Sequence, residues 1–243
     1  MPDRSSPPPP APGAGPAAGR AGVVPSDFVA GNYFDKYRSR NILHRAMMRG
    51  FLRSAGRLVE AARPRRILEV GCGPGDLAWH LLGSGGGPAG PAVDYLGTDV
   101  SDREIAAARR RCPGRRFQVA SIYDLPLESQ SFDLVIACEV FEHLERPDEA
   151  LREVERVCGA HLLISVPWEP MWRVLNVLRG KYLLHLGNTP GHVQHFSRRG
   201  LRQLVGGRFD TLLEDRPFPW TMLLARRRPA RPGCPSKRED GRG

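Results

Sequence analysis

Short apolar runs alternate with longer polar stretches through the middle of the chain. Short apolar runs are typical of buried strands, whereas apolar residues three and four positions apart are typical of a helix face. The expected strands are Arg66–Val70, Tyr95–Thr98, Phe117–Ala120, Phe132–Ala137, His161–Val166, Thr211–Glu214 and Thr221–Ala225. The expected helices between them are Asp76–Leu82, Asp102–Arg111, Asp148–Val157 and Arg198–Val205.

This alternation predicts an α/β fold. Strands that alternate with helices pair in parallel through right-handed crossovers. The last two strands are separated only by a short turn that contains proline, so we expect them to pair antiparallel at one edge of the sheet. The chain is therefore predicted to form a doubly wound, mostly parallel seven-stranded sheet.

The composition divides the chain into regions. Residues 1–26 and 227–243 have almost no large apolar groups and bury too little surface to offset chain entropy, so both are predicted to be disordered tails. Residues 27–64 carry apolar residues at helical spacing with arginines between them, which predicts a basic helical cap. Residues 65–226 are the predicted α/β domain, and its aromatic-rich segment 167–196 is predicted to be a lid inserted over the ligand crevice.

The net charge of +10, from 36 Lys and Arg against 26 Asp and Glu, is unevenly distributed. Residues 36–66 have a net charge of +9 and residues 226–243 of +5, whereas residues 67–225 have a net charge of −3. A slightly acidic body gives no strong nucleic-acid signal. The basic segments are compatible with contact to an anionic membrane surface, and equally with an ordinary solvated, arginine-rich helix face.

The cysteines and the apolar runs indicate the cellular compartment of the protein. The five cysteines show no C-x-x-C spacing, which argues against a disulfide scaffold or a structural zinc site and favours a reducing cytoplasm. No run approaches the ~18 apolar residues of a membrane-spanning helix. The segment Met1–Gly22 lacks the apolar core of a secretory signal. We therefore expect a cytoplasmic protein, with peripheral membrane contact left open.

The first chemical signal is the glycine-rich turn G-C-G-P-G at 71–75, which follows a strand and precedes a helix. Glycines here let the backbone approach a ligand at the carboxyl end of the strand. The spacing differs from the dinucleotide fingerprint G-x-G-x-x-G, because Asp76 stands where the third glycine would fall. Glu69 favours a cationic or amino-bearing ligand, and Asp99, after the second strand, is suited to accept hydrogen bonds from ribose hydroxyls.

A second signal is S-F-D-L-V-I-A-C-E-V-F-E-H-L at 131–144. Together with the glycine turn and Asp99 before it, the chain resembles class I S-adenosylmethionine-dependent methyltransferases over roughly residues 65–225. The resemblance is closest to the small-molecule group that includes ubiquinone-biosynthesis O-methyltransferases. The stretches Y-F-D-K-Y at 33–37 and N-T-P-G-H at 188–192 are similar to those of bacterial methyltransferases of unassigned substrate. The resemblance implies a Rossmann-like methyltransferase fold and a methyl-transferring enzyme.

The resemblance also implies the residues that bind S-adenosylmethionine. They are Glu69, Gly71, Cys72, Gly73, Gly75, Asp99, Val100, Ser121, Ile122 and Cys138. Glu69 and the glycines would line the methionine half of the cofactor, Asp99 would hold the ribose, and Cys138 would lie near the methyl group. Val100 and the turn at Ser121 and Ile122 would contact adenine, although the family usually has an acidic residue in place of Ser121.

An acceptor hydroxyl must lose its proton, and His143 is the first candidate base because histidine titrates near neutrality. Glu142 and His192 are further catalytic candidates. The pattern E-x-x-E-H at 139–143 also resembles one that holds Mg²⁺ in some methyltransferases, which implies a metal site of Glu139, Glu142, His143 and His192. Alternatively, many methyltransferases of this fold end the fourth strand similarly and bind no metal, in which case Glu142 and His143 shape the pocket or supply the base.

The predicted lid combines apolar and basic residues, namely Trp168, Trp172 and Met171 beside Arg173 and Arg179. With the basic cap, this composition favours a lipid-like acceptor met at a membrane surface. The resemblance to O-methyltransferases implies a small-molecule acceptor that is methylated on oxygen. Two alternatives stay open. One is an RNA or protein methyltransferase recruited by the basic segments, and the other is a non-catalytic cofactor-binding module on the same fold.

Overall fold

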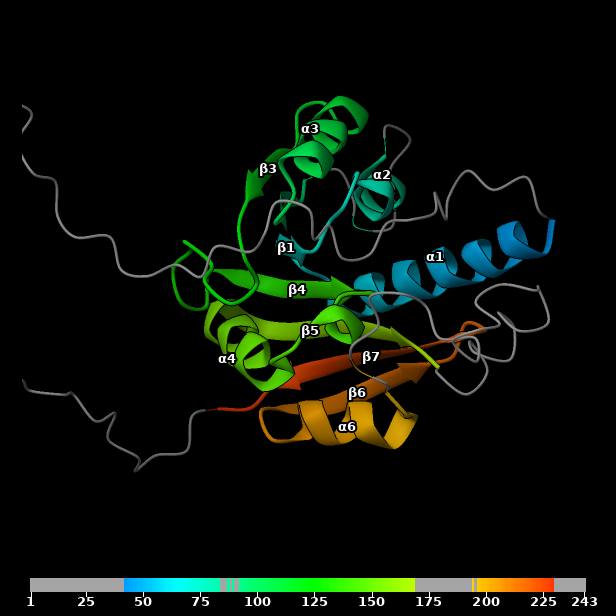
Figure 1. The fold of residues 1–243 in the computed structure, drawn as a ribbon, viewed down its shortest axis with the longest axis vertical. Helices are drawn as coiled ribbons and strands as arrows, with labels where there is room; N and C mark the ends of the chain where they lie inside the picture. The colour runs from blue at the N-terminus through cyan, green and yellow to red at the C-terminus, as the bar shows by residue number, and fades with distance from the viewer. Residues whose placement is uncertain are drawn as a thin grey trace, which may run out of the picture.

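The computed structural model describes residues 42–83, 87, 89, 92–168, 194 and 196–229 (Figure 1). The predicted disordered tails, the lid, the first part of the helical cap and His192 lie wholly or largely outside these residues. Within the described ranges, no helix has both the length and the apolar character needed to cross a bilayer.

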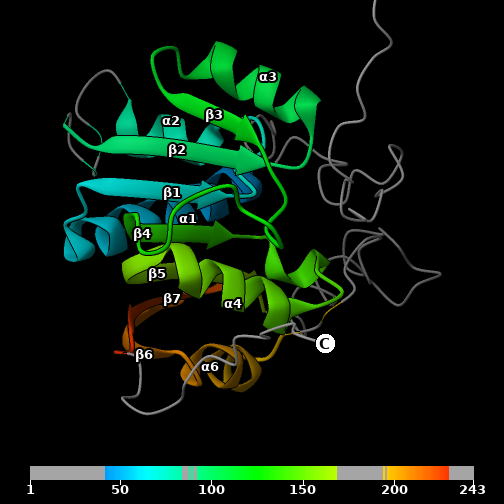
Figure 2. The same cartoon turned by 90° about the vertical axis from the view of Figure 1, so that its left-hand side faces the viewer.

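The described residues build one seven-stranded sheet in the order β3-β2-β1-β4-β5-β7-β6 (Figures 1 and 2). The strands are β1 (Arg66–Val70), β2 (Asp94–Asp99), β3 (Arg116–Val119), β4 (Phe132–Cys138), β5 (Cys158–Pro167), β6 (Phe209–Asp215) and β7 (Trp220–Arg227). Strands β1 to β5 pair in parallel, whereas β7 pairs antiparallel with both β5 and β6. This confirms the predicted doubly wound sheet. Because the strand order reverses between β1 and β4, the crevice for a ligand is expected at their carboxyl ends.

Helices cover both faces of the sheet. They are α1 (Ile42–Ala62), α2 (Asp76–Leu82), α3 (Asp102–Arg111), the short 3₁₀ helix η1 (Phe141–His143), α4 (Pro147–Val157) and α6 (Arg198–Gly206). Helices α1, α2 and α3 contribute to one buried apolar cluster, and α4 and α6 contribute to another. Ser101 begins α3 as its N-cap, because its hydroxyl accepts a hydrogen bond of 3.3 Å from the Glu104 N–H.

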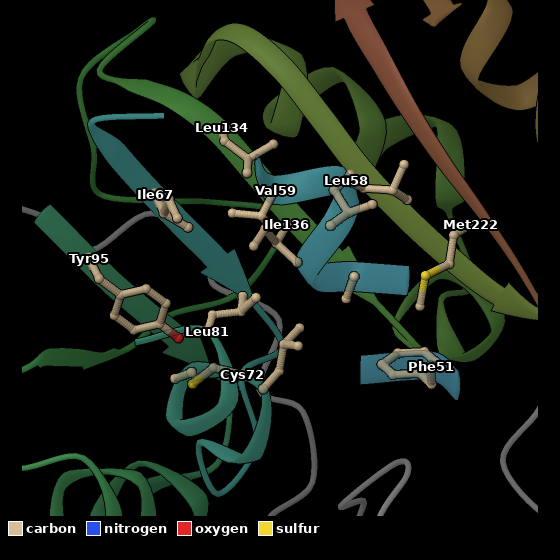
Figure 3. Packing of buried hydrophobic residues seen from close by; sticks show 14 of the residues in the cluster. Phe51, Leu58, Val59, Ile67, Cys72, Leu81, Tyr95, Leu134, Ile136 and Met222 are labelled. Carbon is tan, nitrogen blue, oxygen red and sulfur yellow. The ribbon is translucent and has the colours of Figure 1, made fainter. Parts of the chain in front are cut away.

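The core follows from the alternation of side chains along the strands. Leu134 and Ile136 of β4 are fully buried on one face of the sheet, where Figure 3 shows them beside Val59 of α1. Val135 lies between them in the sequence and is buried on the opposite face, in the cluster that includes Leu151 of α4. Successive residues of a strand point to opposite faces, so a strand buried on both faces reads as a continuous apolar run.

Helix α1 is the described part of the predicted basic cap, and it packs directly on the sheet. It contacts β5 and β7 through buried apolar residues that include Met47, Phe51 and Leu58. The ring of Phe51 meets the ring of Trp220 edge-on, with centroids 5.0 Å apart. The helix is therefore an integral part of the core, and one of its faces is available to line a site at the end of the sheet.

Arg156 of α4 fixes the connection between β3 and β4. Its guanidinium donates hydrogen bonds to the carbonyl oxygens of Leu125 (2.9 Å) and Leu127 (2.7 Å) and to the carboxylate of Glu153 (2.7 Å). The Glu153 carboxylate in turn accepts a hydrogen bond of 2.9 Å from the Leu125 N–H. The hydrogen bond from Arg156 lowers the pKa of Glu153. Two side chains of one helix thus hold a connection that has little regular structure of its own.

Arg156→Ala is expected to lower the free energy of unfolding by about 1–3 kcal/mol, because the Leu125 and Leu127 carbonyls lose their partner. Amide hydrogen exchange in residues 125–130 should also become faster. Urea unfolding measures the first effect and exchange mass spectrometry the second. Arg152→Ala removes an exposed arginine of the same helix and serves as the control, with an expected change below about 0.5 kcal/mol. Equal effects of the two variants would contradict this role for Arg156.

Candidate active site

A cavity of about 230 Å³ is lined by residues at the carboxyl ends of β1, β2 and β4. The residues predicted from the sequence that line it are Glu69, Gly71, Cys72, Gly73, Asp99, Val100, Ile122, Cys138, Glu139 and His143. Gly75, Ser121 and Glu142 are described but lie outside this lining, and His192 lies outside the described residues. The structure therefore brings most of the predicted residues together around one cavity, where the doubly wound sheet is expected to bind its ligand.

The backbone of the glycine turn disfavours side chains at Gly71 and Gly75. Gly71 has a φ of +68°, and a Cβ there would lie 2.5 Å from a methyl carbon of Val140. Gly75 has a φ of +81°, and a Cβ there would lie 3.2 Å from the backbone of Ala108 in α3. Both conformations are rare for residues with a side chain. The glycines therefore bring the turn close to β4 on one side and to α3 on the other.

Asp99 ties this turn to the end of β2. One carboxylate oxygen accepts a hydrogen bond from the Gly73 N–H and the other from the Ser101 N–H, both at 2.9 Å. Each carboxylate oxygen has capacity for more than one hydrogen bond, so both can still accept from a ligand hydroxyl. Asp99 is half-buried and lines the cavity. The residue predicted to hold a ribose thus also organises the backbone beside it.

Glu69 is a buried carboxyl group at the floor of the cavity. It is 4% exposed, and one of its oxygens accepts a hydrogen bond of 2.6 Å from the Tyr95 hydroxyl. Burial raises the pKa of Glu69 to about 8; the Tyr95 hydrogen bond opposes this shift, and the charges of Asp76 and Asp99 add to it. A positively charged ligand beside Glu69 would favour the ionised carboxylate. The site is therefore suited to an ammonium group.

The cysteines of the cavity are buried thiols. Burial raises the pKa of both Cys72 and Cys138 well above the usual value for a thiol, and the charge of Glu69 adds to the shift in each case. A thiol that stays protonated is a poor nucleophile. Cys72 and Cys138 thus act as small apolar wall residues.

The turn after β3 differs in one detail from the prediction. Ile122 lines the cavity, but the hydroxyl of Ser121 accepts a hydrogen bond of 3.2 Å from the Tyr123 N–H. Ser121 also forms an isolated β-bridge with Asp124. The side chain of Ser121 therefore closes its own turn, and an apolar contact from Ile122 is what this turn offers to the cavity.

The wall beyond Cys138 is built around Glu139. Glu139 has a φ of +59°, which is uncommon for a residue with a side chain and costs about 1–3 kcal/mol. Its carboxylate accepts a hydrogen bond of 2.7 Å from the indole N–H of Trp220. Trp220 in turn packs edge-on against Phe51. Glu139 after β4, Trp220 of β7 and Phe51 of α1 thereby form one aromatic and acidic wall.

Sequence reasoning missed three residues of this wall, which are Met48, Phe51 and Trp220. Met48 and Phe51 belong to α1, and the N-terminal helices over residues 32–62 were expected to close the side of the crevice opposite the lid, but residue spacing did not indicate which of their side chains reach the cavity. Trp220 is the first residue of β7, and it pairs with Pro167 at the carboxyl end of β5. An antiparallel strand next to β5 must begin at the carboxyl ends of the parallel strands. This rule could have placed Trp220, the first residue of β7, beside the cavity.

The last two residues of the E-x-x-E-H pattern, Glu142 and His143, have different surroundings. His143 lines the cavity, whereas Glu142 is fully buried, with one of its oxygens 4.0 Å from His143 Nε2. Within the described ranges, no group of three or more side chains is arranged to hold a metal ion. Glu139, the third member, receives the Trp220 hydrogen bond. The magnesium site therefore stays a prediction that depends on His192.

Comparisons with known proteins agree with this geometry. A family model described as a methyltransferase domain matches residues 68–161. Trans-aconitate 2-methyltransferase of Methylobacterium nodulans is 31% identical over 128 residues, which are 51% of this chain and 47% of that protein. Demethylmenaquinone methyltransferase of Chlorobaculum parvum is 29% identical over 140 residues, which are 56% of this chain and 54% of that protein.

A solved structure of magnesium protoporphyrin IX methyltransferase from Synechocystis, with bound SAH, has a TM-score of 0.59 to this chain. The likeness covers 79% of this chain and 91% of that one at 18% sequence identity, so it shows a shared fold. The matches to the two curated relatives span about half the length of each. The family match includes the glycine turn, Asp99 and the end of β4, all of which surround the cavity. Residues 68–161 of this chain therefore match a methyltransferase domain, and the described sheet shares the fold of a solved methyltransferase.

Proposed function

We propose that the protein transfers a methyl group from S-adenosylmethionine to an oxygen atom of a small, apolar or lipid-like acceptor. The observation that carries this proposal is the lining of the cavity described above. One part of the lining consists of the glycine turn, Glu69 and Asp99, which suit the cofactor. The other part consists of an aromatic wall with Glu139 and His143, which suits an acceptor.

The cofactor end of the cavity fits the chemical groups of S-adenosylmethionine. The buried carboxyl of Glu69 suits its ammonium group, and the Asp99 carboxylate suits the ribose hydroxyls. The backbone of the glycine turn is exposed to the methionine portion, and Val100 and Ile122 offer apolar contacts to adenine. When bound, the cofactor supplies a methyl group that is already activated by the positive sulfur. The protein therefore mainly has to orient the acceptor and remove its proton.

His143 and Glu139 are the groups we assign to the acceptor oxygen. His143 would accept the proton of the hydroxyl, because a histidine base titrates near working pH. Glu139, held by the Trp220 hydrogen bond, would accept a hydrogen bond from a second polar group of the acceptor and orient the molecule. Phe51 and Trp220 exclude water on that side and favour an apolar acceptor. If His192 completes the predicted site with Glu139, Glu142 and His143, Mg²⁺ would lower the pKa of the acceptor hydroxyl.

The relatives support a small-molecule acceptor. Trans-aconitate and demethylmenaquinone, which appear in the names of two curated relatives, are small molecules, and the second is lipid-soluble. Their names do not identify the acceptor of this chain, because the match covers about half of each protein. The acceptor atom and a cytoplasmic location are likewise parts of this proposal.

The first test uses the full chain with methyl-labelled S-adenosylmethionine and a lysate of the source organism, followed by separation of organic, aqueous, RNA and protein fractions. Label is expected in the organic or small-molecule aqueous fraction. His143→Ala is expected to slow transfer by about 100- to 10,000-fold, because it removes the proposed base, while cofactor affinity stays the same. His80→Ala, which changes a half-buried histidine outside the cavity lining, is the matched control.

Label only in the RNA or protein fraction would overturn the small-molecule proposal. Cofactor binding without transfer to any fraction would favour the non-catalytic alternative. Transfer at the wild-type rate by His143→Ala would remove His143 from the role of base. A parallel reaction with EDTA tests the ion: loss of label that Mg²⁺ restores would support the predicted metal site, whereas unchanged transfer would exclude a need for it.

A second prediction concerns Glu69 and pH. Because its pKa is raised to about 8 by burial, Glu69 is mostly neutral below that pH and must lose a proton before it can pair with the ammonium group. Cofactor affinity should therefore rise by up to about tenfold per pH unit between about pH 6 and 7.5. In this range the α-amino group of S-adenosylmethionine, with an ordinary pKa of about 7.7–8.0, stays largely charged. Calorimetry in buffers of different ionisation enthalpy should detect the released proton.

Glu69→Gln should weaken binding and abolish both the pH slope and the proton release. Glu104→Gln changes another carboxyl of the cavity lining and should keep both. A flat pH profile in the unmodified protein, with no proton released, would show that Glu69 does not receive the ammonium group.

A further inference from the structure

The outer face of α1 carries a stripe of arginines. Arg45, Arg49 and Arg53 are all exposed and four positions apart, so they project from successive turns on one side of the helix. Arg57 continues the stripe and pairs with Asp215 at 2.6 Å. Within the residues that the structure describes, no ion pair or hydrogen bond is formed by the side chains of the other three. Their charges are therefore available to an anionic partner.

Exposed apolar side chains lie at the same end of the molecule. Ile42 and Leu43, in the first turn of α1, are 80% and 56% exposed, and Phe218 in the turn between β6 and β7 is 48% exposed. That turn lies against α1, because a Cβ added at Gly50 would be 4.0 Å from Cβ of Pro217. Exposed aromatic and aliphatic residues beside arginines are the composition of a surface that enters a lipid interface.

The position of these residues relates the surface to the cavity. The first turns of α1 project beyond the carboxyl end of β4 (Figure 1), and the turn before β7 lies at the carboxyl end of β5. The cavity is at the same edge of the sheet. Met48 and Phe51 line the cavity from the inner face of α1, while Arg45, Arg49 and Arg53 occupy its outer face. One helix therefore separates the cavity from the basic surface.

We propose that this end of the molecule, defined by Arg45, Arg49, Arg53, Ile42, Leu43 and Phe218, docks on an anionic phospholipid bilayer. The arginines bind lipid phosphates, and the apolar side chains enter the headgroup region. Docking brings the cavity edge of the sheet to the bilayer surface, where a lipid-soluble acceptor is concentrated. The identity of the acceptor rests on the proposed function, whereas the docking itself does not.

Charge distribution favours a bilayer in one orientation. Residues 67–225 carry seventeen basic and twenty acidic residues, a net charge of −3, whereas residues 36–66 have a net charge of +9. An anionic surface attracts the α1 side and repels the body of the domain. A nucleic-acid partner would satisfy the arginines but would leave Ile42 and Phe218 in water, so the apolar groups favour lipid.

The test is flotation of the full chain with vesicles of phosphatidylcholine alone and of phosphatidylcholine with about 30% phosphatidylglycerol. Binding is expected only to the anionic vesicles and should weaken as salt rises from about 0.05 M to 0.5 M. R45E/R49E/R53E should reduce the partition coefficient at least about 100-fold, since each arginine near an anionic surface contributes about fivefold. The double variant I42S/F218S should weaken the binding that persists at high salt.

The matched control is R103E/R110E/R152E, which changes the net charge equally through exposed arginines of α3 and α4. It should retain binding nearly as tight as that of the unmodified chain. Thermal unfolding and cofactor binding check that both triple variants fold, and R45Q/R49Q/R53Q replaces the first if it does not. Equal loss in both triple variants, or no binding of the unmodified chain to anionic vesicles, would overturn the proposal.

A single-stranded RNA oligonucleotide is the competing ligand. The bilayer proposal would be wrong if the protein bound RNA but not anionic vesicles, and if R45E/R49E/R53E abolished the RNA binding. The arginines would then be assigned to nucleic-acid binding. Vesicle binding is measured without cofactor or acceptor, so its failure leaves the proposed methyl transfer untouched. Conversely, a failure of methyl transfer leaves the vesicle result standing.

Discussion

The cofactor end of the cavity depends on the two hydrogen bonds that the Asp99 carboxylate accepts. Its two oxygens hold the N–H groups of Gly73 and Ser101, so one side chain fixes both the glycine turn and the start of α3. Gly75 then permits close contact between this turn and Ala108 of α3. Because these hydrogen bonds already fix the carboxylate, little further conformational entropy is lost when it binds a ligand hydroxyl. The two carboxylate oxygens of Asp99 that hold the turn in place are therefore also the atoms proposed to bind the ribose.

The opposite wall is assembled from distant parts of the chain. Glu139 follows β4, Trp220 begins β7, and Phe51 belongs to α1, yet a hydrogen bond and an edge-on ring contact join them. Glu139 retains an unfavourable backbone conformation, and such strain persists only where surrounding contacts hold it. Because Phe51 lies on the helix that also carries the exposed arginines, the acceptor wall and the proposed bilayer surface are two faces of one element.

Much of the fold was predictable because its signals are local. The apolar run of β4 and the glycine turn after β1 depend on neighbours a few positions apart, and the structure has both where they were expected. The same holds for the cap of α3 at Ser101. The roles of Ser121 and Glu142 were less visible, since one hydroxyl closes its own turn and one carboxyl is fully buried behind His143. Neither outcome follows from residue type or spacing.

The sequence by itself determined the order of strands and helices along the chain, the parallel sheet, and the edge of the sheet at which the cavity lies. Periodicity and the rule that ligands bind at the carboxyl ends of parallel strands suffice for these. Only the tertiary structure decided the acceptor end, where Phe51 and Trp220 meet Glu139, and the exposure of Arg45 to Arg53 beside that wall. These contacts join residues far apart in the chain, and their partners are chosen by packing, which no local pattern records.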